Sequence, residues 1–249
     1  MPLPVLDEET VSGFHANGFA RLPRLVDERA LEDIREAYDK LLSGELDTTG
    51  SRDDYLGDLT RQLVGPEHCH ALFRDNPALD AGRAIASQLF AWQPVFLYSQ
   101  LLYKPPGHPH ETPWHQDAAY THMPVARAGT PMPPVTAQFW MALDDADEHN
   151  GCMHFHPTTT ENGLLPHYVV SGAEDNPARL LGLIKAEQHI DPEKVTARPL
   201  AAGCATVHLG STLHYTPANH STRPRRAYIF KFADRAYVEN RGRPSPQSR

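Results

Sequence analysis

Cysteine is scarce in this sequence, which contains only Cys69, Cys152 and Cys204. The three are far apart and form no CxxC pair, so the pattern disfavours both a disulfide framework and a structural zinc site. Reduced cysteines are typical of proteins in a reducing compartment. We therefore expect an intracellular, cytoplasmic protein.

The chain also lacks an excess of basic residues and any long apolar run. It contains 23 Lys and Arg residues and 31 Asp and Glu residues, which gives a formal net charge of −8. Binding to nucleic acid requires clustered Lys and Arg, so we do not expect a nucleic-acid partner. No stretch approaches the length of a membrane span and no signal peptide is visible, so we expect no membrane partner.

The first third of the sequence has helical periodicity. The 249 residues, 40% of them hydrophobic, suffice for one well-buried domain. Asp7 and Asp27 are suitable N-caps, while Gly18 and Gly44 are suitable stops, which predicts a helix between each pair. A third helix is predicted within residues 76–92.

The sequence pattern changes near residue 93, where apolar and polar residues alternate in short segments that are rich in Val, Phe, Tyr and Thr. Many short strands separated by Gly, Pro and Asn are typical of a sandwich or barrel. Residues 161–198 are mostly polar, which predicts an insertion with a loop or short helix. We expect a single domain over residues 1–238, helical over 1–92 and strand-rich over 93–238, followed by a flexible tail at 239–249.

The segment PWHQDAAY contains a histidine and an aspartate two residues apart, His115 and Asp117. In an extended segment, residues i and i+2 point to the same face, so both donors can reach one point. An imidazole nitrogen with a carboxylate oxygen suits Fe(II), Mn(II) or Zn(II). Such a pair also occurs by chance, and a polar turn is the simpler interpretation unless another strand supplies a third ligand.

The segment GSTLHYTPANHSTRPRRAYIF offers that third ligand in His214. Thr216 follows on the same face, and Arg225 comes eleven residues after His214, on the expected next strand. A guanidinium binds a carboxylate through two parallel hydrogen bonds, which indicates a carboxylate-bearing cosubstrate. Arg226 competes for this role, and alternation alone does not decide between the two arginines.

Several motifs occur in the order found in a known family. They are FHANGFARLPRLVDERALEDIREAYDKLL, QLLYKPPG, WHQD, FWMALDDADEHNGCMHFHP and AGCATVHLGSTLHYTPANHSTRPRRA. Together they resemble the phytanoyl-CoA dioxygenase family of Fe(II)/2-oxoglutarate-dependent oxygenases. One departure is PTTT at residues 157–160, where the family usually has a run like PGSH.

The resemblance implies a mainly β fold with N-terminal helices, a double-stranded β-helix (jelly roll, cupin-like) with the helices outside the larger sheet. It implies that Fe(II) is bound by His115, Asp117 and His214. 2-Oxoglutarate would fill two further positions on the metal, leaving one for O2. The expected reaction hydroxylates or otherwise oxidises an unactivated C–H bond of a small organic substrate, while 2-oxoglutarate is decarboxylated to succinate and CO2.

The resemblance also assigns the cosubstrate pocket. Arg225 and Thr216 would hold the distal carboxylate of 2-oxoglutarate, and the family spacing favours Arg225 over Arg226. Lys104 and Trp140 would help to shape the same pocket. We expect the protein to act as a monomer or homodimer.

The long loop AAYTHMPVARAGTPMPPVTAQ lies between the HxD strand and Trp140. Long loops beside a site often act as lids, although an ordinary crossover is an equal alternative for each of its residues. Its mixed character fits a medium-sized substrate with a polar or anionic group. The predicted substrate residues are Tyr120, His122, Met123, Arg127 and, from a neighbouring strand, His156.

Two other classes of protein remain open. A metal-dependent cupin-like enzyme that does not use 2-oxoglutarate would keep the three metal ligands but would not need Arg225 or Thr216. A non-catalytic jelly roll that binds a small molecule is disfavoured by the complete ligand set. Fe(II) uptake would separate the two kinds of enzyme from the non-catalytic protein. The visible charge-transfer band formed with 2-oxoglutarate would separate the two kinds of enzyme from each other.

Overall fold

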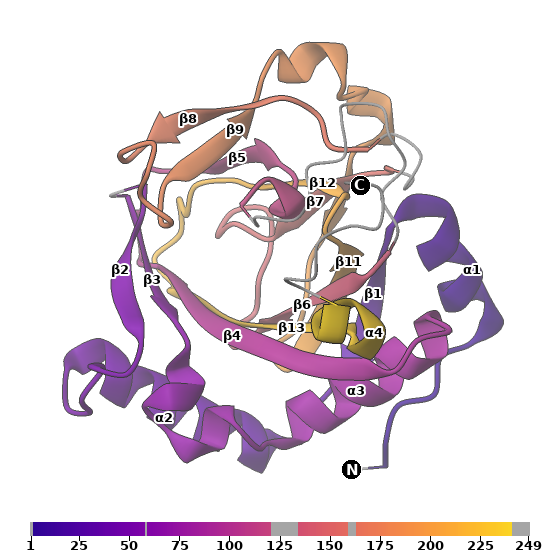
Figure 1. Ribbon diagram of the computed structural model, residues 1–249. Helices are drawn as coiled ribbons and strands as arrows, with labels where there is room; N and C mark the ends of the chain where they lie inside the picture. The colour runs from indigo at the N-terminus through magenta and orange to yellow at the C-terminus, as the bar shows by residue number, and fades with distance from the viewer. Residues whose placement is uncertain (1, 58, 121–133, 159–162, 241–249) are drawn as a thin grey trace.

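The computed structural model describes residues 2–57, 59–120, 134–158 and 163–240 (Figure 1). Its helices and strands are α1 (Glu8–Asn17), β1 (Phe19–Arg24), α2 (Glu28–Ser43), β2 (Arg52–Leu56), β3 (Thr60–Val64), α3 (Pro77–Leu89), β4 (Pro94–Lys104), β5 (Thr112–His115), β6 (Thr136–Ala142), β7 (Met153–His156), β8 (His167–Ser171), β9 (Leu180–Leu183), β10 (Thr196–Arg198), β11 (Cys204–Leu209), β12 (Leu213–Thr216), β13 (Arg225–Asp234) and α4 (Arg235–Asn240).

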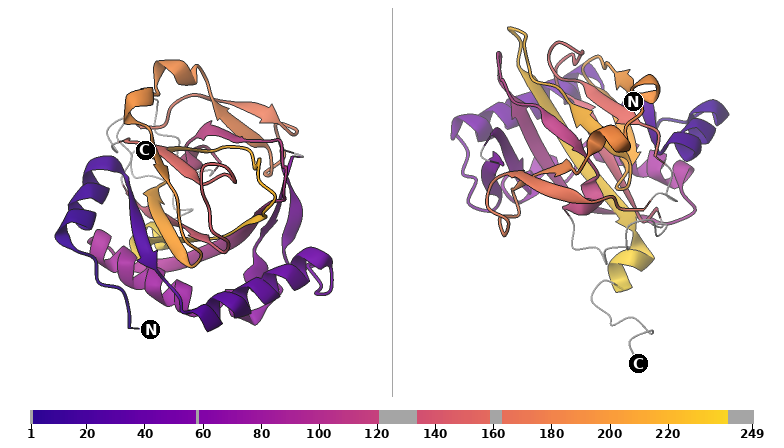
Figure 2. Two further views of the ribbon diagram at one scale, coloured as in Figure 1. Left: turned by 180° about the vertical axis from the view of Figure 1, so that it is seen from behind. Right: turned by 90° about the horizontal axis from the view of Figure 1, so that it is seen from above.

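Two antiparallel sheets face each other. The larger has the strand order β1-β11-β6-β13-β4-β3-β2, and the smaller has the order β10-β7-β12-β5. The helices α2 and α3 lie outside the larger sheet, and the smaller sheet lies on its other side; views from behind and from above show the same layers (Figures 1 and 2). This arrangement confirms the predicted jelly roll with N-terminal helices.

The first two helices begin and end where their caps predict. The carboxylate of Asp7 accepts a hydrogen bond from the backbone N–H of Thr10, and Asp27 caps α2 in the same way. Gly18 and Gly44 end these helices in the left-handed conformation. The third helix is shorter than predicted, since it ends at Leu89.

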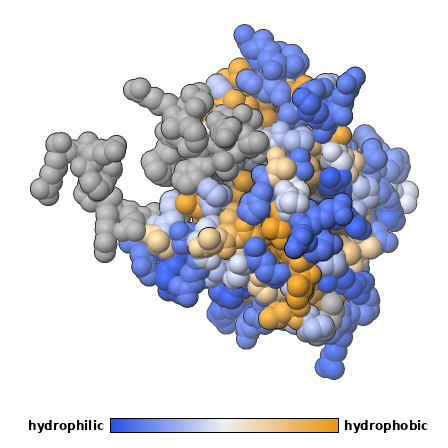
Figure 3. Space-filling model, turned by 90° about the vertical axis from the view of Figure 1, so that its right-hand side faces the viewer, coloured by the Kyte–Doolittle hydropathy of each residue, from blue (hydrophilic) through white to orange (hydrophobic). Residues whose placement is uncertain are grey.

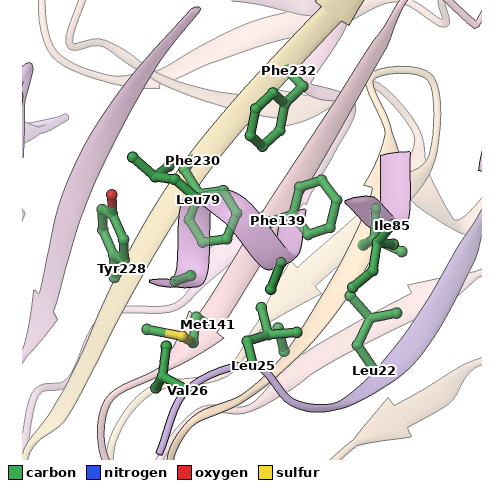
Figure 4. Packing of buried hydrophobic residues seen from close by; sticks show 14 of the residues in the cluster. Leu22, Leu25, Val26, Leu79, Ile85, Phe139, Met141, Tyr228, Phe230 and Phe232 are labelled. Carbon is green, nitrogen blue, oxygen red and sulfur yellow. The ribbon is translucent and has the colours of Figure 1, made fainter. Parts of the chain in front are cut away.

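The strand β13 separates the two faces of the larger sheet. Tyr228, Phe230 and Phe232 belong to the core beneath the helices, where Figure 4 shows Phe230 and Phe232 near Phe139. Ala227 and Ile229 belong to the cluster between the sheets. Odd-numbered residues of β13 therefore face the interior of the jelly roll.

Residues 163–198 contain the predicted loop and short helix, since Ala186–Gln188 and Pro192–Lys194 are short 3-10 helices. They also contain strands that were not predicted, the hairpin β8–β9 and the strand β10. The alternating segment HYVVS pairs with β9, where a Cβ at Gly182 would lie 2.8 Å from Val170 and 3.1 Å from Tyr168. The predicted tail also overlaps α4 at residues 239–240, and its other residues lie outside the described part.

No helix among the described residues is long and apolar enough to cross a membrane. The face drawn in Figure 3 is mainly hydrophilic, with smaller apolar areas. The three cysteines are free, as their spacing predicts.

Replacing Gly18 with Ala should destabilise the fold by about 2–4 kcal/mol, because a Cβ would add a steric clash to left-handed strain. That Cβ would lie 2.6 Å from both the carbonyl oxygen of Thr158 and Oγ1 of Thr212. Gly44→Ala is the matched control, since Gly44 has a similar φ and nothing within 4 Å of the added Cβ. It should cost only about 1 kcal/mol in urea unfolding. Equal losses in the two variants would contradict the steric argument.

Candidate active site

A histidine, an aspartate and a second histidine meet between the two sheets. His115 ends β5, Asp117 follows two residues later, and His214 lies on β12 directly opposite His115. Asp117 Oδ1 is 3.7 Å from His115 Nε2 and 3.6 Å from His214 Nε2. All three side chains are buried, and their donor atoms lie within 4.8 Å of one another. The structure thus brings together the three predicted metal ligands.

The backbone fixes the orientation of both imidazole rings. His115 Nδ1 donates to the carbonyl oxygen of Pro113 at 2.7 Å, and His214 Nδ1 donates to that of Thr212 at 2.9 Å. Each Nε2 therefore presents its lone pair toward Asp117. Burial holds the pKa of His214 well below its ordinary value, so this ring is neutral, as a metal ligand must be.

A third imidazole, His208, binds the other oxygen of the same carboxylate. Its Nε2 donates to Asp117 Oδ2 at 3.1 Å, and its side chain is fully buried on β11. Sequence analysis missed this residue. The segment ATVHL predicts a strand, but nothing in it shows which chain segment His208 faces.

The predicted cosubstrate residues lie on neighbouring strands. Lys104 is opposite Arg225 across β4 and β13, and its Nζ donates to Thr216 Oγ1 at 2.9 Å and to the carbonyl oxygen of Pro217 at 2.7 Å. Burial, followed by the nearby Arg225, holds the pKa of Lys104 well below its ordinary value. Lys104 thereby fixes the Thr216 hydroxyl with its oxygen as acceptor.

Arg225 is fully buried, and its guanidinium lies 5.4 Å from the ring centroid of Trp140. Within the described part of the chain, Nε, Nη1 and Nη2 all lack a hydrogen-bond partner. A buried cation with five unsatisfied donors is costly unless a ligand supplies acceptors.

Arg226 points the other way, toward the helices. It forms ion pairs with Asp144 at 2.6 Å and with Asp39 of α2 at 2.7 Å. These carboxylates already satisfy its charge. Of the two competing arginines, Arg225 is therefore the one on the inner face without a partner.

A cavity of about 360 Å³ opens over this cluster. The two histidines and Asp117 line it, together with Thr216 and Trp140. Apolar side chains such as Leu102 and Ile229 surround the polar groups. A mostly apolar cavity with a few convergent polar groups is the usual form of a small-molecule site.

The predicted substrate residues differ in their placement. Tyr120 lines the cavity, where its hydroxyl accepts a hydrogen bond from the backbone N–H of Leu181 at 2.9 Å. Three of the predicted residues, His122, Met123 and Arg127, lie outside the described residues. His156 is not a cavity residue, because it lies on the opposite face of β7 from Met153, which is one.

The family model of the phytanoyl-CoA dioxygenases (PhyH) matches residues 14–227. The chain belongs to this family of Fe(II)/2-oxoglutarate-dependent oxygenases. The resemblance found in the sequence motifs is thus confirmed. The match runs from α1 to the third residue of β13, so it includes the three candidate metal ligands as well as Lys104, Trp140, Thr216 and Arg225.

Solved structures and curated relatives agree with this membership of the phytanoyl-CoA dioxygenase family. EvdO2 from Micromonospora carbonacea var. aurantiaca, solved with 2-oxoglutarate, is 31% identical with a TM-score of 0.74, over 93% of this chain and 92% of that one. The epimerase SnoN, solved with Fe3+, alpha ketoglutarate and nogalamycin RO, is 21% identical with a TM-score of 0.65, over 91% and 83%. It shares the fold.

Among curated proteins, phytanoyl-CoA dioxygenase domain-containing protein 1 of Danio rerio is 30% identical over 147 residues. The match covers 59% of this chain and 47% of that protein. The chain spans about half the length of the curated relatives it matches.

Proposed function

We propose that this protein is an Fe(II)/2-oxoglutarate-dependent dioxygenase that hydroxylates, or otherwise oxidises, an unactivated C–H bond of a small organic substrate. 2-Oxoglutarate would be decarboxylated to succinate and CO2. The observation that carries the proposal is the buried His115–Asp117–His214 cluster in a cavity whose wall includes Trp140, the ring beside the Arg225 guanidinium, for which the described residues offer no hydrogen-bond partner. The likeness to EvdO2, solved with 2-oxoglutarate, supports it.

The residues of the cluster fit Fe(II). Two neutral imidazoles and one carboxylate on one face form the ligand set of non-haem iron oxygenases. Both Nε2 lone pairs are free, since each Nδ1 is held by a backbone carbonyl. When bound, Fe(II) with 2-oxoglutarate and O2 would supply the oxidising power for C–H cleavage.

The residues on β12 and β13 fit the distal carboxylate of 2-oxoglutarate. Arg225 is fully buried, and its donors find no acceptor among the residues that the structure describes. Thr216 Oγ1 accepts a hydrogen bond from Lys104, so its own O–H is free to donate to a carboxylate. The Trp140 ring covers the guanidinium and excludes water from it.

The rest of the cavity would hold the substrate against the metal cluster. Tyr120 is fixed by β9 at the cavity wall. His122, Met123 and Arg127, which lie outside the described residues, stay proposed substrate residues. Our proposal for the substrate wall includes Tyr120 but leaves out His156, because of its position on β7.

The test is an anaerobic titration of the metal-free protein with Fe(II) and then 2-oxoglutarate. We expect the visible metal-to-ligand charge-transfer band that a chelated 2-oxo acid gives with Fe(II). Metal uptake without this band would contradict the use of 2-oxoglutarate and favour the cupin-like alternative. Failure to take up Fe(II) would favour a non-catalytic binding protein.

His208 is expected to act as a positioning residue for Asp117. Replacing His208 with Phe should weaken Fe(II) affinity by about 10- to 100-fold, because Oδ2 of Asp117 loses its donor and the carboxylate can rotate. His208→Gln, which keeps an N–H donor, should restore part of this loss. Fe(II) dissociation constants measured anaerobically, beside thermal unfolding of the metal-free variants, separate positioning from general destabilisation. Wild-type affinity in His208→Phe would overturn the role.

A further inference from the structure

A second cation lies on the inner face of β13, apart from Arg225. The inward residues of this strand are Arg225, Ala227, Ile229 and Lys231. Six residues of strand place the Cα atoms of Arg225 and Lys231 about 20 Å apart. The strand therefore carries a positive charge at each end of its inner face, with apolar side chains between them.

Lys231 is 4% exposed and lines the cavity over the metal cluster. Its Nζ lies 5.5 Å from the ring centroid of Tyr98, and it forms no ion pair with any residue that the structure describes. Burial lowers the pKa of Lys231, but Tyr98 and Asp117 outweigh that effect and leave the pKa above its ordinary value. Asp117 of the metal cluster is thus the one carboxylate among the described lining residues that acts on this ammonium group, and it lies beyond ion-pair distance.

Two arginines are among the described lining residues, and one of them adds to this charge. Arg179 lines the same cavity, and its Nη1 donates to the carbonyl oxygen of Asn176 at 3.1 Å, with no carboxylate of the described residues in an ion pair with it. Arg52 lies 3.0 Å from Asp54 and is thereby neutralised. Among the described lining residues Asp117 is the only carboxylate, and it belongs to the metal cluster. An excess of positive charge is therefore concentrated inside a protein whose net charge is −8.

The cosubstrate does not account for these cations. If the proposed function holds, one carboxylate of 2-oxoglutarate goes to the metal with the 2-oxo group, and the other goes to Arg225. Its carboxylate carbons are only about 5 Å apart in an extended chain. Lys231 and Arg179 are left over, and a buried ammonium is stabilised by an oxyanion that can accept its hydrogen bonds.

We propose that the substrate is an organic oxyanion, whose carboxylate, phosphate or sulfate group binds Lys231, with Arg179 as a second, more exposed contact. The inference rests on the proposed function, because it takes the other end of the cavity as the cosubstrate site. The apolar lining residues Ile229 and Leu102 would face the carbon skeleton of the substrate. Lys231 would then act as a specificity residue that holds the anion while the C–H bond lies near the metal.

The test uses matched probes on the anaerobic protein saturated with Fe(II) and 2-oxoglutarate. 3-Phenylpropionate carries the anion, and 3-phenylpropanamide is its neutral counterpart of similar size. Calorimetric titration should show the acid binding about tenfold or more tightly than the amide. Lys231→Met should remove this preference by weakening the acid alone. Lys231→Arg should keep it, and Arg179→Gln should reduce it by about threefold or more.

Lys194→Met is the matched control, because Lys194 is exposed on the surface and pairs with Asp191. It should leave both affinities unchanged. Equal binding of acid and amide by the wild type, or no binding of either up to ~10 mM, would overturn the inference. An unchanged preference in Lys231→Met would also overturn it, and if that variant does not fold, an unchanged preference in Arg179→Gln would do so.

The charge-transfer band separates this inference from the proposed function. The band should form in Lys231→Met with wild-type affinity for 2-oxoglutarate. If the band is absent from the wild type, the proposed function fails. If the band forms in the wild type but weakens in Lys231→Met, Lys231 belongs to the cosubstrate site and the inference alone is overturned.

Discussion

Replacing His214 with Ala is expected to lower Fe(II) affinity by at least ~100-fold and to abolish the 2-oxoglutarate charge-transfer band. The variant leaves only His115 and Asp117, which lie on one short segment. His214 supplies the donor from the opposite strand, 3.6 Å from Asp117 Oδ1. Without it, an incoming metal has two protein ligands and no fixed face on which 2-oxoglutarate can chelate.

His220→Ala is the matched control for this experiment. His220 is exposed and follows β12 by four residues, outside the cavity. It should keep wild-type Fe(II) affinity and the full band. The metal-free His214→Ala protein should still unfold cooperatively, since the loss is that of a ligand rather than of the fold. A band of wild-type intensity in His214→Ala would rule out His214 as the third ligand.

If the cluster is preformed, Fe(II) binding should also raise the free energy of unfolding of the protein. Both imidazoles are held by backbone carbonyls before any metal arrives, so binding costs little rearrangement. A ligand present at 100 times its dissociation constant adds about 2.7 kcal/mol to the free energy of unfolding. His214→Ala should lose this increment, whereas His220→Ala should retain it.

The sequence predicts most strongly those features that depend on local chemistry. Asp7 and Asp27 cap their helices because a short carboxylate at that position satisfies N–H groups three residues on. The pair His115 and Asp117 shares a face because Gln116 between them is extended. These outcomes depend on neighbours within a few residues, so the chain carries their signal directly.

Features that depend on the order of strands in the sheets leave no such local signal in the sequence. His208 meets Asp117 because β11 lies beside β6 in the larger sheet, far from β5 along the chain. Lys231 enters the cavity because β13 lies between β6 and β4. The segment RRAYIFKFA shows that Lys231 alternates with aromatic residues, but only the arrangement of the sheets shows that its face is a cavity. Sequence alone therefore pointed to the candidate ligands but not to His208 or to Lys231 in the cavity.

The adjacent arginines Arg225 and Arg226 depend both on local alternation and on the arrangement of the sheets. Alternation predicts that they point to opposite faces, but it does not say which face holds the helices. In the structure, Arg226 is paired with Asp39 and Asp144, whereas Arg225 is buried without a partner in the described part of the chain. One arginine stabilises the packing of α2 on the sheet, and the other is kept at a cost that a ligand can offset.

Arg225→Met should therefore weaken 2-oxoglutarate binding while stabilising the protein that has no ligand. Binding should fall by about 100-fold or more, because a buried carboxylate would lose its charged partner. Burial lowers the pKa of Arg225 to about 10, which reflects the cost of holding the cation away from water. Methionine keeps an apolar stem without that charge, so we expect about 1–3 kcal/mol of added stability in urea unfolding without 2-oxoglutarate.

Arg226→Met serves as the control one residue away, and neither effect of Arg225→Met is expected in it. It should leave the affinity for 2-oxoglutarate unchanged, because its side chain lies on the helix side of the sheet. It should destabilise the fold by about 1–3 kcal/mol, since Asp144 would be left partly buried and unpaired. The crossed pattern of the two variants, measured by the charge-transfer titration and by urea unfolding, identifies the carboxylate-binding arginine. Loss of 2-oxoglutarate binding in Arg226→Met, with full binding in Arg225→Met, would assign the carboxylate-binding role to Arg226 instead. A general loss of stability would not explain that result, because it would not leave 2-oxoglutarate binding intact in one variant and abolish it in the other.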